Sequence, residues 1–377
     1  MAHGAIRFGV LGPLQMSANG ADLPLGPAKQ RAVLATLLIN RNRTVPIDTL
    51  IDAAWQRCPP PEARASLHAH VSRLRRLVGS VGADAAAVLV SASPGYRLNV
   101  PDEACDFGRF AIERRAGIQA ATAGRFEEAS GRLSSALAEW RGPVLEDLRD
   151  FGFVDAFAAA LIEDKLVTLT ARAEAEIACG RTHSVIGELE ALVAEHPYRE
   201  PLWAQLITAY YLAERQYDAL DAYARLKTAL ADDLGIDPGP TLRGLHQRIL
   251  SQEPLDVESA ARATAKRAAA TLRRPADGSR DSAVAHLRDA AGGRHPLGGA
   301  ATRIGRLSDN DIVIDDDTVS RYHAVIVDTG NSFVITDLQS ANGIDVAGRR
   351  IRISATLADG DRICICGHEF TFEIREG

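Results

Sequence analysis

The spacing of apolar positions divides the chain into regions with different periodicities. Short alternating segments with a Gly-Pro break and an Asn-Gly turn open the chain, and helical periodicity then dominates up to residue 253. Period-two alternation returns towards the C-terminal end, as in 333–335 and 368–374, between turns rich in Gly, Asn and Asp. Between these regions, residues 254–284 contain almost no large apolar side chain. This segment predicts a linker, part of it helical, because it cannot bury much surface.

The first hundred residues predict strands, three helices and a hairpin, in that order. The helices are expected at 28–40, 47–55 and 62–77, and a proline lies near the start of each. Residues 88–91 and 96–100 flank a Ser-Pro-Gly sequence and predict the hairpin. This order is typical of a winged helix-turn-helix domain, whose recognition helix lies in the major groove of DNA.

The third predicted helix carries the candidate DNA-binding face. Leu67, Val71, Leu74 and Val78 recur at the spacing of one buried stripe. The opposite face has small residues, which allow close approach to the groove, and arginines, which can contact phosphates or guanine edges. The candidate DNA-binding residues, with one in the predicted wing, are Arg64, Ala69, Ser72, Arg73, Arg76 and Arg97. A solvated basic face is the alternative. The pattern also places His68 and His70 beside this face, with no ligand set for a metal.

Several separated motifs in this region support the interpretation. LGPLQM, HAHVSRLRRLVG and PGYRLNV resemble the DNA-binding domain of the Streptomyces antibiotic regulatory protein family. That domain is similar to the OmpR-type winged helix. The resemblance therefore implies a winged-helix DNA-binding domain over residues 1–102.

Residues 103–253 predict an all-α domain with tetratricopeptide-like repeats. Trp203, Leu206, Tyr210 and Tyr223 match the spacing of one repeat, and such helix pairs must stack to cover their apolar faces. We expect these aromatic side chains to pack a core. The region resembles the bacterial transcriptional activation domain of the same family, with LADDLGIDPGPTL as a matching signature. The resemblance implies contacts with the DNA-binding domain, a second subunit or RNA polymerase.

Three short motifs dominate residues 285–377. They are Ile304-Gly305-Arg306, Val319-Ser320-Arg321-Tyr322-His323 and Ser340-Ala341-Asn342-Gly343. Their residues and separations resemble a forkhead-associated domain, an all-β sandwich that binds phosphothreonine peptides. Guanidinium and hydroxyl donors suit a phosphate, which brings nearly two negative charges and three acceptor oxygens.

The resemblance implies a role for each motif residue. Ser320 binds the phosphate through its hydroxyl, and Arg306 and Arg321 contact the phosphate or the adjacent peptide backbone. Asn342 hydrogen-bonds the peptide backbone beside the phosphothreonine. The residues that shape or brace the site are Gly305, His323 and Gly343.

Two positions depart from the pattern of the forkhead-associated family. Ala341 stands where that family often has Ser or Thr, and Ile344 stands where it often has Thr. Ala341 removes a possible hydroxyl donor to the phosphate, and Ser340 is the candidate substitute. The alternative is a β-sandwich whose phosphate site has decayed.

Charge separates the regions further. Residues 1–101 hold 11 Lys and Arg against five Asp and Glu, residues 102–253 hold 16 against 26, and the whole chain has a net charge of −6. Only the first region has an electrostatic reason to approach nucleic acid. The five cysteines are scattered and odd in number, which favours a reducing compartment. Since no signal peptide or membrane span is predicted, we expect a cytoplasmic protein without membrane contacts.

The sequence contains no pattern typical of a catalytic centre. A G-x4-G-K-[ST] loop, a G-x-S-x-G elbow and an H-E-x-x-H pair are all absent from it. Asp309, Asp311 and residues 315–317 lack the glycine and terminal glutamate of a calcium loop, and we interpret them as turn residues. Cys364 and Cys366 have no nearby cysteine pair to complete a zinc site. We expect neither an enzyme nor a metal or cofactor.

The complete order predicts a multidomain α+β chain: winged helix-turn-helix, all-α tetratricopeptide-like domain, linker and all-β forkhead-associated β-sandwich. This order resembles the EmbR-type regulators of mycobacteria, which serine/threonine protein kinases phosphorylate and which bind phosphopeptides through the C-terminal domain. The resemblance implies a DNA-binding transcription regulator whose partners are promoter DNA and a phosphorylated kinase or another phosphothreonine protein. The alternative is a phosphopeptide-binding adaptor that does not bind DNA specifically. A monomer and a homodimer are both compatible with the sequence.

Overall fold

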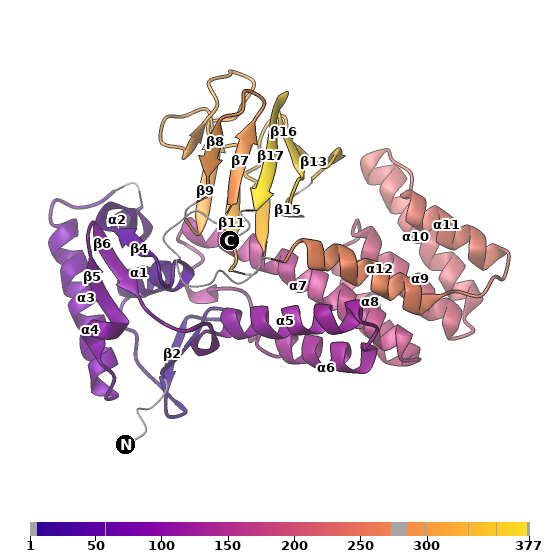
Figure 1. The fold of residues 1–377 in the computed structure, drawn as a ribbon, viewed down its shortest axis with the longest axis horizontal. Coiled ribbons are helices and arrows are strands. Elements are labelled where there is room, and N and C mark those ends of the chain that lie inside the picture. Colours follow the sequence, from indigo (N-terminus) through magenta and orange to yellow (C-terminus); the bar gives the residue numbers. More distant parts are fainter. Residues whose placement is uncertain are drawn as a thin grey trace. The chain divides into compact units, whose positions relative to one another are not determined.

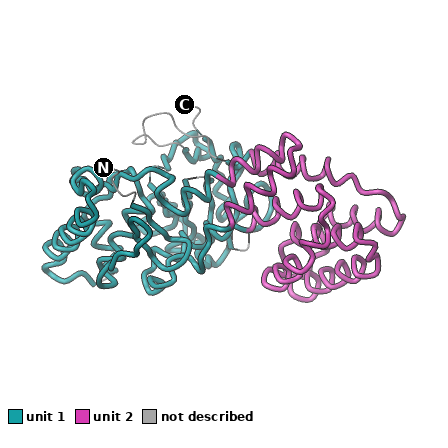
Figure 2. The backbone as a smooth tube through the Cα atoms, turned by 90° about the horizontal axis from the view of Figure 1, so that it is seen from below, with its two compact units in different colours: residues 1–112, 138–165, 270–377 teal, residues 113–137, 166–269 magenta. Residues whose placement is uncertain are grey.

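A computed structural model of the chain describes residues 6–56, 58–272, 285–297, 299–330, 332–351 and 353–374. The chain forms two compact units (Figure 2). The first unit consists of Met1–Ile112, Ala138–Lys165 and Ala270–Gly377, and the second of Glu113–Leu137 and Leu166–Ala269. None of the described helices is long and apolar enough to cross a membrane.

The N-terminal part of the first unit is a winged helix (Figure 1). An antiparallel sheet is formed by β1 (Ile6–Gly9), β2 (Gln15–Ala18) and β3 (Ala21–Asp22). The helices are α1 (Ala28–Ile39), α2 (Ile47–Trp55), α3 (Ala63–Ser80) and the short α4 (Ala85–Val88). A second antiparallel sheet, in the order β4-β6-β5, is formed by β4 (Thr44–Pro46), β5 (Leu89–Ala92) and β6 (Gly95–Leu98).

Helix α3 has the buried stripe that its sequence predicts. Leu67, Val71, Leu74 and Val78 are all buried, and α3 packs against α1 and α2. The hairpin of β5 and β6 is the predicted wing. Strand β4, which pairs with β6, was not predicted because three residues are too few to show a period-two pattern.

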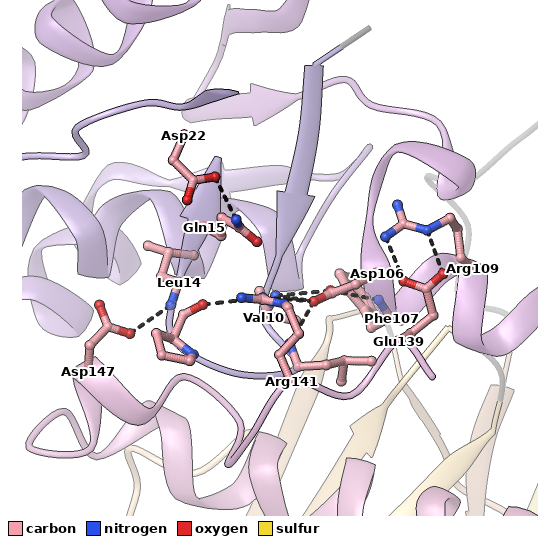
Figure 3. A network of polar contacts seen from close by, with 12 residues as sticks. Val10, Leu14, Gln15, Asp22, Asp106, Phe107, Arg109, Glu139, Arg141 and Asp147 are labelled. Carbon is pink, nitrogen blue, oxygen red and sulfur yellow. Dashed lines mark hydrogen bonds and ion pairs between the residues drawn. The ribbon is translucent and has the colours of Figure 1, made fainter. Parts of the chain in front are cut away.

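Two carboxylates from the activation region hold the loop between β1 and β2 (Figure 3). Asp106 accepts a hydrogen bond from the backbone N–H of Val10 at 2.8 Å, and Asp147 accepts one from the backbone N–H of Leu14 at 2.7 Å. Asp106 is buried, and a buried carboxylate without hydrogen bonds would be costly in free energy, so its bonds to the backbone stabilise it. Within the first unit, the backbone between β1 and β2 is therefore paired with the side chains of Asp106 and Asp147.

Helices dominate the middle of the chain, as predicted. They are η1 (Asp102–Ala104), α5 (Asp106–Thr122), α6 (Phe126–Leu137), η2 (Glu146–Leu148), α7 (Phe153–Ala178), α8 (Thr182–Glu195), α9 (Glu200–Leu212), α10 (Gln216–Leu234), α11 (Pro240–Leu250) and α12 (Val257–Ala270). In the second unit, α9 packs against α8 and α10. Trp203, Leu206, Tyr210 and Tyr223 are buried there in one apolar core, in agreement with the packing role expected of the aromatic residues.

The first half of the predicted linker is a packed helix. Alanines recur on one face of α12, and Ala261 and Ala265 join a buried cluster with Phe126 and Ala175 of the second unit. A helix with almost no large apolar side chain can still pack because alanine lets two helices approach closely. The rest of the predicted linker, residues 273–284, lies outside the described residues.

The C-terminal region is the predicted all-β sandwich. One sheet has the order β10-β9-β11-β12-β15 and the other the order β14-β13-β16-β17-β7-β8. The strands are β7 (Ala285–Asp289), β8 (Arg294–Pro296), β9 (Ala301–Gly305), β10 (Ile312–Val313), β11 (Ala324–Asp328), β12 (Phe333–Asp337), β13 (Ile344–Val346), β14 (Arg349–Arg350), β15 (Ser354–Leu357), β16 (Arg362–Ile365) and β17 (His368–Ile374). Their inward side chains, Phe333 and Phe372 among them, form one apolar core.

Candidate functional site

The three C-terminal motifs meet at one end of β9, β11 and β12. Ala324 lies opposite Ile304 in β9 and opposite Asp337 in β12, so the residues beyond these three positions share one edge of the sheet. We call residues 305–323 and 338–343 the phosphate loops. The two antiparallel pairings therefore bring together side chains that are up to 36 positions apart in the sequence, namely Arg306 and Asn342.

His323 joins the phosphate loops from inside. The side chain is fully buried, its Nδ1 lies 3.1 Å from the backbone N–H nitrogen of Ser320, and its Nε2 lies 3.2 Å from the carbonyl oxygen of Gly343. Since the Ser320 N–H can only donate, Nδ1 accepts, and Nε2 must carry the proton that is donated to Gly343. The bracing role that the sequence resemblance implied for His323 agrees with this geometry.

The polar groups of the phosphate loops are held by one another. Ser320 Oγ accepts a hydrogen bond from the backbone N–H of Ala341 at 3.1 Å. The Asn342 side chain donates from Nδ2 to the Thr318 carbonyl at 2.8 Å. Ser340 Oγ accepts a hydrogen bond from the Gly343 N–H at 2.8 Å, and this bond stabilises the 338–343 loop. The loops are thus ordered around the Ser320 hydroxyl.

Two arginines, Arg306 and Arg321, lie in the same phosphate loop as this hydroxyl. Arg306 donates from Nε to the Val319 carbonyl at 3.3 Å, and its Nη1 lies 3.4 Å from a carboxylate oxygen of the exposed Asp317. Arg321 is exposed. Gly305 is required by close packing, because a Cβ at this position would lie 2.4 Å from the Arg321 carbonyl oxygen. The guanidinium groups of Arg306 and Arg321 therefore lie in the same phosphate loop as the Ser320 hydroxyl.

Two further residues contribute to the site, and the first of them was not predicted from the sequence. Arg350 in β14 donates from Nη2 to the carbonyl oxygen of Asn342, and it packs where a Cβ on Gly343 would lie. Asp316 accepts from the Thr318 N–H at 2.7 Å and from its hydroxyl at 2.6 Å. The hydrogen bond from the Thr318 hydroxyl and, to a smaller extent, the one from His368 lower the pKa of Asp316 to about 2. This aspartate organises a turn, as interpreted from the sequence.

The exposed face of α3 carries most of the candidate DNA-binding residues. Ala69, Ser72, Arg73 and Arg76 are exposed, opposite the buried stripe. Arg64 is also exposed and lies 3.4 Å from Asp48 of α2. The small and basic side chains therefore form a face that is open to solvent, as the helical periodicity indicates.

Two positions differ from the simplest expectation for this surface. Arg97 lies in β6, the central strand of its sheet, and is half-buried. His70 does not lie beside the exposed face, because it is only 8% exposed and contacts the side chains of Gln30 and Trp55. It follows Leu67 by three positions, which brings it onto the buried side of α3. Burial, together with nearby Arg73 and Lys29, lowers the pKa of His70.

The described residues contain no group of three or more His, Cys, Asp or Glu side chains that could hold a metal ion. Asp309, Asp311 and Asp316 have other contacts. Asp309 accepts from the Tyr322 hydroxyl, and Asp311 accepts from the Arg303 N–H at 2.7 Å. These aspartates are thus engaged by hydrogen bonds from Tyr322, from Thr318 and from Arg303 of the adjacent strand β9.

Three protein families match successive parts of the chain. The family of C-terminal domains of transcriptional regulatory proteins matches residues 21–98, the bacterial transcriptional activator domain matches 105–250, and the FHA domain matches 302–366. The transcriptional regulatory protein EmbR of Mycobacterium tuberculosis is 62% identical over 373 residues, which cover 99% of this chain and 96% of EmbR. The chain belongs to the EmbR family of transcriptional regulators.

Other relatives share parts of this EmbR-family architecture. Transcriptional regulatory protein MoaR1 of Mycobacterium tuberculosis is 51% identical over 254 residues, covering 67% of this chain and 82% of MoaR1. Regulatory protein AfsR of Streptomyces coelicolor is 39% identical over 271 residues, covering 72% of this chain and 26% of AfsR.

The fold agrees with a solved structure of the EmbR family. The structure of Mycobacterium tuberculosis EmbR in complex with a low-affinity phosphopeptide has a TM-score of 0.94 and 61% identity, and the match covers 99% of both chains. The predictions of an EmbR-type regulator and of its three-domain fold class are confirmed. The chain is a transcriptional regulator with a winged-helix DNA-binding domain and a forkhead-associated phosphothreonine-binding domain.

Proposed function

We propose that the phosphate loops bind a phosphothreonine of a serine/threonine protein kinase or of another phosphorylated protein, and that this binding controls promoter recognition by α3 and the wing. The observation that carries the proposal is the buried His323, which holds the Ser320 and Asn342 loops in one arrangement. EmbR of Mycobacterium tuberculosis has been solved with a phosphopeptide, which supports the choice of ligand. Of the candidate residues, we propose that Arg306, Ser320, Arg321 and Asn342 touch the ligand. Ser340 Oγ accepts from the Gly343 N–H, and we propose that Ser340 supports the ligand site through this bond.

The hydrogen bonds of the phosphate loops suggest how the ligand is held. A phosphate group carries about −1.5 to −2 charges at neutral pH and accepts charge-assisted hydrogen bonds. Ser320 Oγ donates its proton to one phosphate oxygen, and Arg306 turns from the exposed Asp317 to another. The Ala341 N–H, which donates to Ser320 Oγ in this structure, supplies a further donor. Ala341 thus contributes through its backbone although its side chain has no hydroxyl.

The test is calorimetric titration of the full chain with peptides from kinase activation loops. Each peptide is used with threonine, phosphothreonine and phosphoserine at the same position. We expect phosphothreonine-dependent binding that Ser320→Ala weakens at least about tenfold, since a hydrogen bond to a charged group contributes about 1.5–3 kcal/mol. Ser135→Ala, a surface serine on α6, is the matched control and should leave the affinity unchanged. Equal binding of phosphorylated and unphosphorylated peptides would contradict the proposal.

A second titration separates the regulator from a phosphopeptide adaptor that does not bind DNA specifically. A DNA duplex selected by the full chain from a random library is compared with a scrambled duplex over a range of salt concentrations. Specific binding that weakens steeply as salt rises is expected of a protein that neutralises several phosphates. Equal affinity for the two duplexes would favour the adaptor.

The remaining parts of the proposal concern the assembly around the promoter. We propose that the chain acts by binding, without catalysis, and that the activation domain contacts RNA polymerase. A homodimer fits paired promoter half-sites, whereas a monomer fits a single site. Sedimentation of the full chain with and without phosphopeptide distinguishes these states, and a cytoplasmic location follows from DNA as the target.

A further inference from the structure

Arg75 connects the recognition helix to the wing. It lies on α3 between the exposed face and the buried stripe, and its side chain is directed at strand β5. Its Nε donates to the Leu89 carbonyl at 2.9 Å, and its Nη2 donates to Ser91 Oγ at 2.9 Å. The planar guanidinium therefore contacts two points of one strand, which fixes both distance and orientation.

A second contact joins α3 to the other strand of the wing, β6. His68 Nδ1 lies 2.6 Å from the Tyr96 hydroxyl oxygen, and the Tyr96 side chain is buried in the wing. Tyr96 pairs with Ser91 across the hairpin, and its ring centroid lies 5.7 Å from the Arg75 guanidinium. His68 and Arg75 are two helical turns apart on α3, so Tyr96 is held between them.

We propose that Arg75 and the His68–Tyr96 pair are positioning residues, which hold the wing at a fixed place against α3 without touching DNA. The proposal rests on the proposed DNA-binding role of α3 and the wing. A short hairpin is marginally stable by itself, and β6 gains only the three-residue β4 as its other neighbour. A site built from a helix and a wing needs its parts held to about 0.5 Å.

The surface of α3 offers the alternative that Arg75 is a phosphate contact. Its neighbours Arg73 and Arg76 are exposed and have the charge and reach for that role. Charge-conserving variants separate the two roles. Arg75→Lys keeps the charge but replaces the planar fork, whose two nitrogens bond the Leu89 carbonyl and Ser91 Oγ separately, with a single ammonium nitrogen. Tyr96→Phe removes one hydroxyl without any charge.

The experiment measures affinity of the full chain for the selected duplex and for its scrambled counterpart, over a range of salt concentrations. We expect Arg75→Lys to reduce the ratio of specific to nonspecific affinity about tenfold and Tyr96→Phe about threefold, with the salt dependence unchanged. Arg76→Met is the comparison for a phosphate contact. It should weaken both affinities and reduce the slope of log K against log salt by about 0.9.

Amide hydrogen exchange in the free chain tests, without DNA, whether Arg75 and the His68–Tyr96 pair hold the wing against α3. Arg75→Lys should raise the exchange rates of β5 and β6 about tenfold relative to α1, because the local opening becomes easier. Unchanged exchange, or an unchanged affinity ratio in Arg75→Lys, would overturn the proposal. So would an Arg75→Met variant that reduces the salt slope as Arg76→Met does. If the wild-type chain does not distinguish the two duplexes, the proposed specific binding of DNA is wrong, and the positioning role is wrong with it. The exchange result still shows whether Arg75 holds the wing against α3.

Discussion

Strands β11 and β12 carry polar residues at both of their ends, and the two sets differ in burial and in pairing. At one end, Arg321 and Asn342 of the phosphate loops are exposed to solvent. At the other end, the strands are joined by a turn that contains Asp328, Thr329, Gly330 and Ser332, which we call the docking turn. Asp328, Thr329 and Ser332 are 6%, 1% and 0% exposed. Each of the two strands therefore has one end at an open site and the other at a closed one.

The docking turn is paired with residues from two other parts of the first unit. Asp328 lies 2.7 Å from Arg43, which precedes β4 of the winged helix. Thr329 and Ser332 donate to opposite oxygens of Asp164 in α7, at 2.9 Å and 2.7 Å. Each contact joins residues that are more than 160 positions apart in the sequence.

The difference follows from what each end must do. A ligand site has to keep donors accessible, and its loops hold these donors with bonds that a phosphate can replace. A buried polar group has to be paired within the protein, since an unpaired one costs about 1–3 kcal/mol and an unpaired charge more. We therefore expect substitutions in the phosphate loops to change ligand affinity, and substitutions in the docking turn to change stability.

Asp328→Ala should have the largest effect on this comparison. The side chains of Asp328 and Arg43 are 2% and 16% exposed, and removing one partner of a buried ion pair costs about 3–5 kcal/mol. Because Arg43 keeps some access to water, we expect about 3 kcal/mol. In amide exchange on the full chain, rates in β11 and β12 should rise about 100-fold, while phosphopeptide affinity changes less than about twofold.

An exposed ion pair in the same sandwich provides the control. Glu369→Ala removes the contact with Arg362, whose side chain is 67% exposed. Exposed pairs contribute about 0–1 kcal/mol, so exchange in β11 and β12 should hardly change. Equal effects of Asp328→Ala and Glu369→Ala would mean that burial does not distinguish the docking turn.

Sequence patterns predicted the open end and missed the closed one, for a physical reason. The phosphate loops contain residues whose type and spacing form a motif that can be recognised in the sequence, namely Ser320, His323 and Asn342. Asp328 and Ser332 are ordinary turn residues, whose partners come from distant segments. Nothing local in the sequence marks such pairing.

The same division applies to the helices. The buried stripe of α3 was predictable because apolar residues that recur about every 3.6 positions indicate which face of a helix is buried. The burial of His70 depends on the neighbouring Gln30 and Trp55, and the packing of α12 depends on which alanines meet Phe126. Arg350 reaches Asn342 from another strand, so no motif contains it. Periodicity and motifs thus predict elements and ligand groups, whereas tertiary contacts decide the rest.

Ser332→Ala should have the next largest effect. It removes one hydroxyl donor to the buried Asp164 carboxylate, for which we expect a loss of about 2 kcal/mol. Amide exchange in β11 and β12 should rise about 30-fold, and calorimetric titration with the phosphopeptide should give the wild-type affinity. A variant that weakened peptide binding as strongly as Ser320→Ala would show that the two ends of the strands are not independent.

Ser340→Ala is the matched substitution in the phosphate loops and should have a smaller effect on stability than Asp328→Ala or Ser332→Ala. Ser340 Oγ accepts from the Gly343 N–H at 2.8 Å in a half-buried position, where water can replace part of the lost bond. We expect the free energy of opening that amide exchange measures at β11 and β12 to fall by less than about 1 kcal/mol. Phosphopeptide affinity should fall about fivefold, because the backbone at Asn342 is less well held. The two serines then give opposite results for one chemical change: Ser332→Ala alters stability and Ser340→Ala alters binding. If Ser340→Ala left phosphopeptide affinity unchanged, the order of this loop would not matter for the ligand, and the open end would reduce to the side chains of Arg306, Ser320 and Asn342.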